Sequence, residues 1–297
     1  MLNPPLALLS DDLLVSIVEH VANLPSRDED LHNLSLADRA FTQSCQKYIF
    51  WNLRFSSKGD ISERVKKVKK ILLDNPTFAN QVRMVGFLLS PDEEYARLFN
   101  DHTLISIFQL LSESPMPPHE LHFSGGKFGG YISSKMNSSF FMTLKNWTIP
   151  LMKPIAQSFF SKTLTILHLT ACTNTPLPML LICPRLRKVF LDNVGATTCT
   201  SYDEYEYPDY LFSGRVPPPL EVLDYRNSHS LVKQMITPPP RFNTPVVVWS
   251  NLRILTLSPH EKEGMACLQP ILDAACNSLE ELYLTSTDMG GCMFFFG

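Results

Sequence analysis

The hydrophobic residues at the start of the chain recur at helical spacing. In "PLALLSDDLLVSIVEHV" (5–21) the apolar positions lie mostly three or four residues apart: Leu9, Leu13, Leu14, Ile17, Val18 and Val21. This spacing is typical of an amphipathic helix. Ser10 suits the N-cap of that helix, and Asp11 and Asp12 suit the positive end of its dipole.

Two further short helices are predicted after the turn-rich stretch "NLPSRDED" (23–30). The apolar residues of the first are Leu31, Leu34, Leu36 and Phe41, and the second ends on Tyr48, Phe50 and Trp51. Three helices as short as these bury little surface by themselves. We therefore expect a small helical unit that leaves an apolar patch exposed for a partner.

A different amphipathic helix is predicted from residue 61. In "ISERVKKVKKILLDNP" (61–76) the apolar residues occupy one face and the lysines the other. The lysines have two interpretations, a patch that binds anions or a solvated helix face. The second is favoured because the rest of the chain is not basic.

Beyond this helix one short template recurs, with apolar residues at its first, fourth and usually sixth positions. Strong copies are "LTILHL" (164–169), "LRKVFL" (186–191), "LEVLDY" (220–225), "LRILTL" (252–257) and "LEELYL" (279–284). Weaker copies are "VRMVGF" (82–87), "PHELHF" (118–123) and "FMTLKN" (141–146). The strong copies resemble the leucine-rich repeat, whose unit of about 20–29 residues begins with L-x-x-L-x-L.

A strand with two or three inward leucines cannot bury them alone, so successive strands must stack into a parallel sheet. The alternating pattern favours a sheet with one covered and one open face, since strands buried on both faces are continuously apolar. In such a curved sheet, the chain returns from the end of one strand to the start of the next along the outer, convex side. Segments 150–162, 176–184 and 265–278 are expected to form these returns. The longer intervals place insertions near 195–216 and 229–248, which are either binding loops or tolerated additions.

Composition narrows the class of protein. The 297 residues carry a formal charge of −3, which gives no sign of nucleic-acid binding. The seven cysteines include no C-x-x-C pair, which favours reduced thiols and a cytoplasmic or nuclear location. We expect neither a signal peptide nor a membrane span.

No catalytic or metal-binding motif is recognised. "HELH" (119–122) lacks the H-E-x-x-H spacing that places two ligands on one helix face. "SGGKFGG" (124–130) resembles a phosphate-binding loop but has Tyr131 where that motif needs lysine. We therefore expect a protein that is not an enzyme and that has no cofactor and no metal ligand.

The N-terminal residues 6–55 resemble an F-box, the three-helix motif that docks onto the Skp-type adaptor of cullin–RING ubiquitin ligases. The family's "LP-x-E-[LI]-[LI]" appears as Leu9-Ser10-Asp11-Asp12-Leu13-Leu14, with Ser10 in place of proline, and Ile17 follows. Its "DL-x-x-L" segment begins at Asp30-Leu31, and its late aromatic residue appears as Phe50-Trp51. The alternative is a plain helical cap over the first repeat.

The resemblance implies an α/β chain in which a small three-helix F-box (6–55) and a connecting amphipathic helix (61–80) precede a leucine-rich-repeat solenoid (81–297). Such a protein is a substrate receptor of an SCF-type ubiquitin ligase, with a Skp-type adaptor and an unknown target protein as partners and no nucleic acid or membrane. The alternative is a leucine-rich-repeat scaffold without a ligase. Residues expected to be divided between the small core and the adaptor surface are Leu9, Leu13, Ile17, Leu31 and Leu34.

Contacts to a target are expected from side chains that flank the central apolar position of each repeat and point out of the sheet. These residues are Trp147, His168, Phe190, Asp192, Asp224, Arg226, Glu281 and Tyr283. Their mixture of aromatic groups and both charge signs favours protein recognition. The chain stops at "GGCMFFFG" (290–297) without a polar closing repeat, so we expect a truncated or mispredicted C-terminus or a dimer contact there.

Overall fold

The computed structural model describes residues 10–24, 27–56, 60–89, 102–125, 142–143, 161–173, 175, 177–196, 215–237, 245–258, 262–285 and 293–296. Three helices come first: α1 (Asp11–Ala22), α2 (Arg27–Ala37) and α3 (Arg39–Ile49). The Ser10 hydroxyl accepts a hydrogen bond from the Leu13 amide at 3.4 Å, which confirms the predicted N-cap. The third helix ends earlier than predicted, because Phe50 is already its C-cap.

These helices enclose a small hydrophobic cluster of their own. Its buried residues are Leu14, Val18, Ala22, Leu31, Phe41 and Cys45. Asp38 stabilises the start of α3, where its carboxylate accepts a hydrogen bond from the Ala40 amide at 2.9 Å. The cluster is distinct from the larger hydrophobic core of the sheet.

A nine-stranded sheet forms the main body of the described residues, and its strand order follows the chain. Eight strands run parallel: β1 (Asn52–Ser56), β2 (Met84–Leu89), β3 (Glu120–Gly125), β5 (Ile166–Thr170), β7 (Lys188–Asp192), β8 (Val222–Arg226), β9 (Ile254–Leu257) and β10 (Glu281–Thr285). The ninth, β11 (Met293–Phe296), pairs antiparallel with β10, so the C-terminal phenylalanines belong to an edge strand.

The pairing register aligns the apolar residues of the strands in two rows on one face of the sheet. One row is Leu53, Val85, Leu121, Leu167, Val189, Leu223, Leu255 and Leu282. The other is Phe55, Phe87, Phe123, Leu169, Leu191, Tyr225, Leu257 and Leu284. Nearly all of these side chains are buried, because each strand alternates inward and outward positions.

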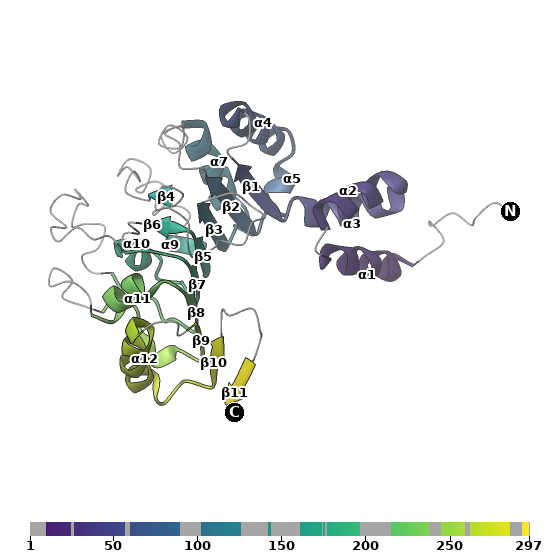
Figure 1. Ribbon diagram of the computed structural model, residues 1–297. Coiled ribbons are helices and arrows are strands. Elements are labelled where there is room, and N and C mark those ends of the chain that lie inside the picture. Colours follow the sequence, from purple (N-terminus) through teal and green to yellow (C-terminus); the bar gives the residue numbers. More distant parts are fainter. Residues whose placement is uncertain are drawn as a thin grey trace.

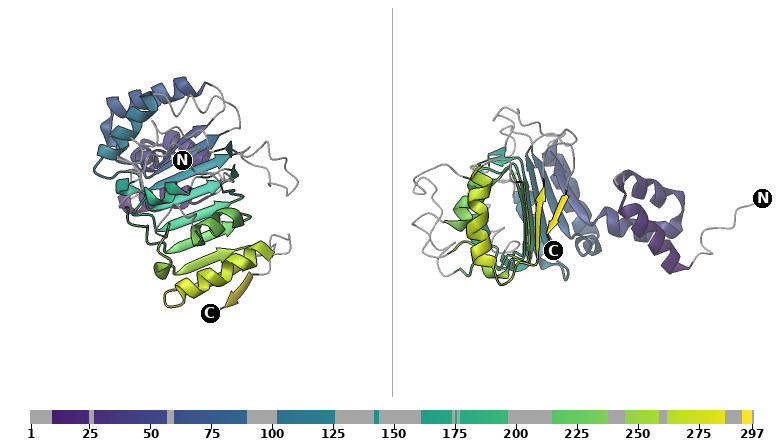
Figure 2. Two further views of the ribbon diagram at one scale, coloured as in Figure 1. Left: turned by 90° about the vertical axis from the view of Figure 1, so that its left-hand side faces the viewer. Right: turned by 60° about the horizontal axis from the view of Figure 1, so that its bottom comes forward.

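Helices cover that apolar face, as Figure 1 and Figure 2 show. They are α4 (Ile61–Asp74), α7 (His102–Glu113), α10 (Pro178–Leu181), α11 (His229–Ile236) and α12 (Lys262–Ala275). The connections between strands also contain the short helices α5 (Pro76–Ala79) and α9 (Ser161–Thr163) and the 3-10 helix η7 (Trp249–Asn251). We call the opposite side, defined by the outward residues of β1 to β10, the open face. The three N-terminal helices project on that side, next to the β1 end of the sheet (Figures 1 and 2).

Three strands end in the same unusual backbone conformation. Ala171, Asn193 and Asn227 follow β5, β7 and β8 directly, and each has a positive φ of about 50° (52°, 53° and 48°). Asparagine tolerates this left-handed region better than most residues with a side chain. Consecutive strands therefore leave the sheet through equivalent turns.

The predicted strands are largely confirmed. All five strong copies of the template and the weaker ones at 82–87 and 118–123 lie on neighbouring parallel strands. The copy at 141–146 was assigned wrongly, because β4 (Met142–Thr143) pairs with β6 (Cys172–Thr173) in a separate two-stranded sheet. Conversely, β1 was not predicted, and it falls inside the range assigned to the helical unit.

The second predicted insertion also needs correction. Helix α11 occupies the first part of residues 229–248 and buries Leu231, Val232 and Met235 in the main core. That part is therefore a regular covering helix of the sheet. The tyrosine-rich stretch 201–210 lies outside the described residues. No helix among those described combines the length and apolar character that a membrane span requires.

Candidate functional site

The open face presents one outward side chain per strand at a single register position. Across β3, β5, β7, β8, β9 and β10 this row consists of His122, His168, Phe190, Asp224, Thr256 and Tyr283. Each occupies the position between two inward apolar residues of the template. Side chains from far apart in the sequence therefore lie side by side.

Aromatic rings stack along the first half of this row. The rings of His122 and His168 have centroids 3.9 Å apart, and those of His168 and Phe190 are 4.1 Å apart and nearly parallel. Neighbouring strands are separated by about 4.8 Å, so side chains in direct register are held at stacking distance. The result is a continuous stack of three rings over three strands.

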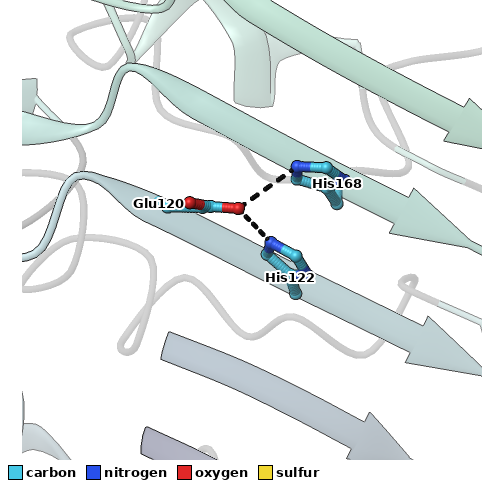
Figure 3. Close-up of side chains that lie close together, drawn as sticks. All are labelled: Glu120, His122 and His168. Carbon is cyan, nitrogen blue, oxygen red and sulfur yellow. Dashed lines mark hydrogen bonds and ion pairs between the residues drawn. The ribbon is translucent and has the colours of Figure 1, made fainter. Parts of the chain in front are cut away.

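Glu120 joins the two histidines into a polar cluster (Figure 3). Its Oε1 atom lies 2.6 Å from Nε2 of His122 and 3.3 Å from Nε2 of His168. Glu120 and His122 are two residues apart on β3 and therefore project from the same side of the strand. The three side chains keep 21%, 34% and 28% of their surface exposed for Glu120, His122 and His168, respectively.

The surroundings set the protonation of this cluster. Partial burial raises the pKa of Glu120, but the hydrogen bonds to His122 and His168 more than offset it, so that this pKa lies well below its usual range. Desolvation lowers the pKa of His122, against the raising effect of its hydrogen bond to Glu120. At neutral pH the cluster therefore contains a carboxylate that accepts a hydrogen bond from an uncharged His122 ring.

A second charged group lies two strands further along. Asp192 ends β7 and Asp224 lies on β8, with the Arg226 Nε atom 3.7 Å from an Asp224 carboxylate oxygen. Desolvation raises the pKa of both carboxyl groups, against the opposing effect of Arg226. The neighbouring Asp192 charge raises the pKa of Asp224 further.

The structure brings five of the predicted target contacts together. His168, Phe190, Asp192, Asp224 and Arg226 all lie on the adjacent strands β5, β7 and β8. The other two described residues, Glu281 and Tyr283, lie on β10 and are separated from them by β9. The Tyr283 hydroxyl donates a hydrogen bond to the Glu281 carboxylate. Trp147 lies outside the described residues.

The predicted adaptor residues divide between surface and core. Leu13 and Ile17 on α1 expose 53% and 38% of their surface. Leu34 is partly buried against the helical cluster, and Leu31 is completely buried in it. Leu31 therefore belongs to the small core, because none of its surface is accessible, and Leu13 and Ile17 are the members of the set that could contact an adaptor. Leu9 lies outside the described residues.

Glu120 and His122 were not predicted from the sequence as functional residues. The "HELH" segment was tested against the spacing of a helical metal motif, whereas in a strand the relevant spacing is two residues. The third member, His168, is 46 positions from His122 and joins the cluster only through the pairing of β3 with β5. One signal in the sequence could have predicted this meeting. His122 and His168 occupy the same position, the fifth, of the template copies "PHELHF" and "LTILHL".

Comparisons with protein-family models, with curated proteins and with solved structures find no match to this chain.

Proposed function

We propose that this protein is the substrate-receptor subunit of a cullin–RING ubiquitin ligase of the SCF type. In this proposal the three N-terminal helices are an F-box that binds a Skp-type adaptor. The sheet is a leucine-rich-repeat solenoid whose open face binds the target protein. The ranges 6–55, 61–80 and 81–297 are then the F-box, its connection and the repeats, with β1 added to the repeat part.

The observation that carries the proposal is the separation of the helical unit from the sheet. A helical cap that seals a solenoid would extend its hydrophobic core. Here α1 to α3 pack around their own cluster and leave apolar side chains exposed: Leu13, Val15, Ile17, Leu24 and Leu36. Several exposed apolar residues on so small a unit favour a protein interface over a simple cap.

The open face supports the second half of the proposal. It combines the aromatic stack of His122, His168 and Phe190 with the charged group around Arg226. Aromatic residues and arginine are enriched in the energetically important centres of protein interfaces. A surface of this composition suits a protein target.

In this mechanism the chain contributes binding alone. Holding a target beside the ligase raises its effective concentration near the ubiquitin-transfer machinery, which accelerates modification without any covalent step on the receptor. The receptor needs two independent binding surfaces and a fixed relation between them. The short connection from α3 into β1 supplies this, with the ring of Phe50 stacked on that of Phe78 at 4.1 Å.

The test is a binding assay with purified full-length chain and a Skp-type adaptor. Leu13→Asp should reduce affinity for the adaptor at least about 30-fold, because a buried unpaired charge at an interface costs about 2 kcal/mol or more. Leu73→Asp on α4 is the matched control, since Leu73 is 54% exposed and Leu13 is 53% exposed. The control should bind the adaptor like the wild type.

Equal binding by the wild type and by Leu13→Asp would contradict the proposal, as would absence of adaptor binding by the wild type. The second result would favour the scaffold alternative, in which the same sheet recruits its partner without a ligase. In that alternative the open face still binds a partner protein, and substitution of Phe190 or Arg226 should weaken that binding. Adaptor binding and target binding are thus tested separately.

A further inference from the structure

We propose that Glu120, His122 and His168 form a Zn²⁺-binding site on the open face of the sheet. The inference is independent of the ligase proposal, because it depends only on three side chains and their geometry. Among the described residues these three are a group whose ligand atoms all lie within 4.8 Å of one another.

The donor set suits zinc. Two imidazole nitrogens and one carboxylate oxygen are ligands that Zn²⁺ accepts readily, and three protein ligands leave a further position for water or another group. Zinc bonds of about 2.0–2.2 Å in a tetrahedral arrangement place ligand atoms about 3.3–3.5 Å apart. The Glu120–His168 pair is already 3.3 Å apart, and the Glu120–His122 pair, at 2.6 Å, needs to open by less than 1 Å.

The ligand atoms also converge. Figure 3 shows the Nε2 atoms of both histidines on the side of Glu120, each joined to the same carboxylate oxygen. The two rings are stacked with their planes 25° apart, so one ring has to rotate about its Cβ–Cγ bond for both lone pairs to meet a single ion. In the metal-free chain a hydrogen bond from His122 occupies this region. A bound cation would replace that proton and keep the same three side chains as neighbours.

The backbone holds the ligands in place. Glu120 and His122 flank Leu121 on β3, and His168 follows Leu167 on β5, directly across from His122. Leu121 and Leu167 are buried beneath them with 1% and 0% exposure. Ligands mounted on rigid paired strands lose little freedom when a metal binds.

Access and charge are compatible with binding. The three side chains are each between 21% and 34% exposed, so an ion can enter from the open face. The Glu120 carboxylate supplies a negative charge. The exposed Arg54 is in register with Gly86 and, through it, with His122, so its positive charge lies on the same face and opposes the binding of a cation. Removing that arginine charge should therefore strengthen zinc binding slightly.

Thiols offer no comparable site among the described residues. Cys172 and Cys183 are buried, and burial raises the pKa of the Cys172 thiol to about 12 and that of Cys183 in the same direction. Cys276 is exposed but belongs to no group of potential ligands found in the described part of the chain. Zinc bound through sulfur would therefore indicate a site other than the one proposed.

The first experiment measures Zn²⁺ affinity of the metal-free full-length chain by competition with a chromophoric chelator. One ion per chain is expected. His122→Gln, His168→Gln and Glu120→Gln should each weaken affinity about 100-fold or more, since loss of even a supporting group around a metal ligand costs 10–100-fold. His102→Gln, at the exposed start of α7, is the matched control and should bind zinc normally. Arg54→Gln should bind at least as tightly as the wild type.

The second experiment replaces zinc with Co²⁺ and records the absorption spectrum of the wild type. Coordination by two nitrogens and an oxygen should give visible d–d bands without the near-ultraviolet charge-transfer band of a cobalt thiolate. This readout does not depend on whether any variant folds. A thiolate band, a lack of stoichiometric binding, or zinc affinity unchanged in all three ligand variants would each overturn the proposal.

Discussion

At the scale of single residues, the open face depends on carboxyl groups that differ in their surroundings. Glu120 accepts hydrogen bonds that favour its ionised form, so its pKa is lowered. Asp192 and Asp224 are partly buried, which raises the pKa of both carboxyl groups, and the Asp192 charge raises the pKa of Asp224 further. Carboxyl groups on different strands of the same face thus have opposite effects on stability.

Asp224→Asn should increase the free energy of unfolding at pH 7. The raised pKa means that the folded chain disfavours the charged carboxyl group, so the aspartate destabilises the fold wherever it is ionised. This difference is present above the folded-state pKa and disappears below the unfolded-state value of about 3.9. Denaturant unfolding of both proteins at pH 7 and at successively lower pH measures the gap.

Asp192→Asn is the companion variant and should also increase the free energy of unfolding at pH 7. Partial burial raises the pKa of the Asp192 carboxyl group, as it does for Asp224. The Arg226 charge and the hydrogen bond that the Asp192 carboxylate accepts from the Asn193 side chain oppose the effect without reversing it, since the pKa of Asp192 is still raised. A loss of stability in both variants at pH 7 would contradict the prediction.

At the scale of elements, the strands are held by the two inward rows of apolar residues. Each row continues through eight strands in register, so every inward side chain packs against its equivalents on the neighbouring strands and against the covering helices. The outward positions have no such layer above them. Adjacent residues of one strand are therefore expected to differ sharply in their contribution to stability.

Leu255→Ala on β9 should lower the free energy of unfolding by about 2–5 kcal/mol, because it leaves a cavity at a completely buried position. Ile254→Ala, one position earlier on the same strand, should cost clearly less, since that side chain lies on the open face and is partly exposed. Urea unfolding monitored by circular dichroism compares the two. Equal losses would contradict the assigned faces.

The elements were predictable to the extent that they repeat a pattern. Leucines at alternating positions predicted β5, β7, β8, β9 and β10, because each strand must bury one side. The strand β1 has the same inward pair, Leu53 and Phe55, but follows α3 after two residues, so the pattern was attributed to the end of a helix. "FMTLKN" matches the pattern, but its strand β4 pairs with β6 outside the main sheet. A local pattern does not specify the partner strand.

At the scale of the whole molecule, the described residues form two hydrophobic clusters joined by a short connection. The helical cluster centres on Leu14 and Val18, and the sheet core extends from Phe55 to Ala275. Two side-chain contacts lie at this connection. The rings of Phe50 and Phe78 stack, and the Arg83 guanidinium lies 5.9 Å from the centre of the Trp51 ring. Because few contacts join the two clusters, each is expected to unfold independently of the other.

Leu14→Asp should unfold the helical unit and leave the sheet folded, because it places a charge in the small cluster where Leu14 is 6% exposed. Hydrogen exchange should lose protection across residues 11–49 while strands β2 to β9 keep theirs. Leu13→Asp, at the exposed neighbouring position, should keep protection throughout. Simultaneous loss of protection in the sheet would show that the two clusters unfold as one.

Most of the residues that face the core could be predicted from the amino-acid sequence, because the periods of two and of about 3.6 residues follow directly from strand and helix geometry. The N-cap at Ser10 and the strands β5, β7, β8, β9 and β10 could be predicted as well, whereas β1 and α11 could not. The register of the strands, and with it the set of outward side chains that meet, depends on tertiary pairing. Glu120 and His122 face His168 because β3 pairs with β5 in one alignment, and a shift by one residue would turn every side chain to the opposite face.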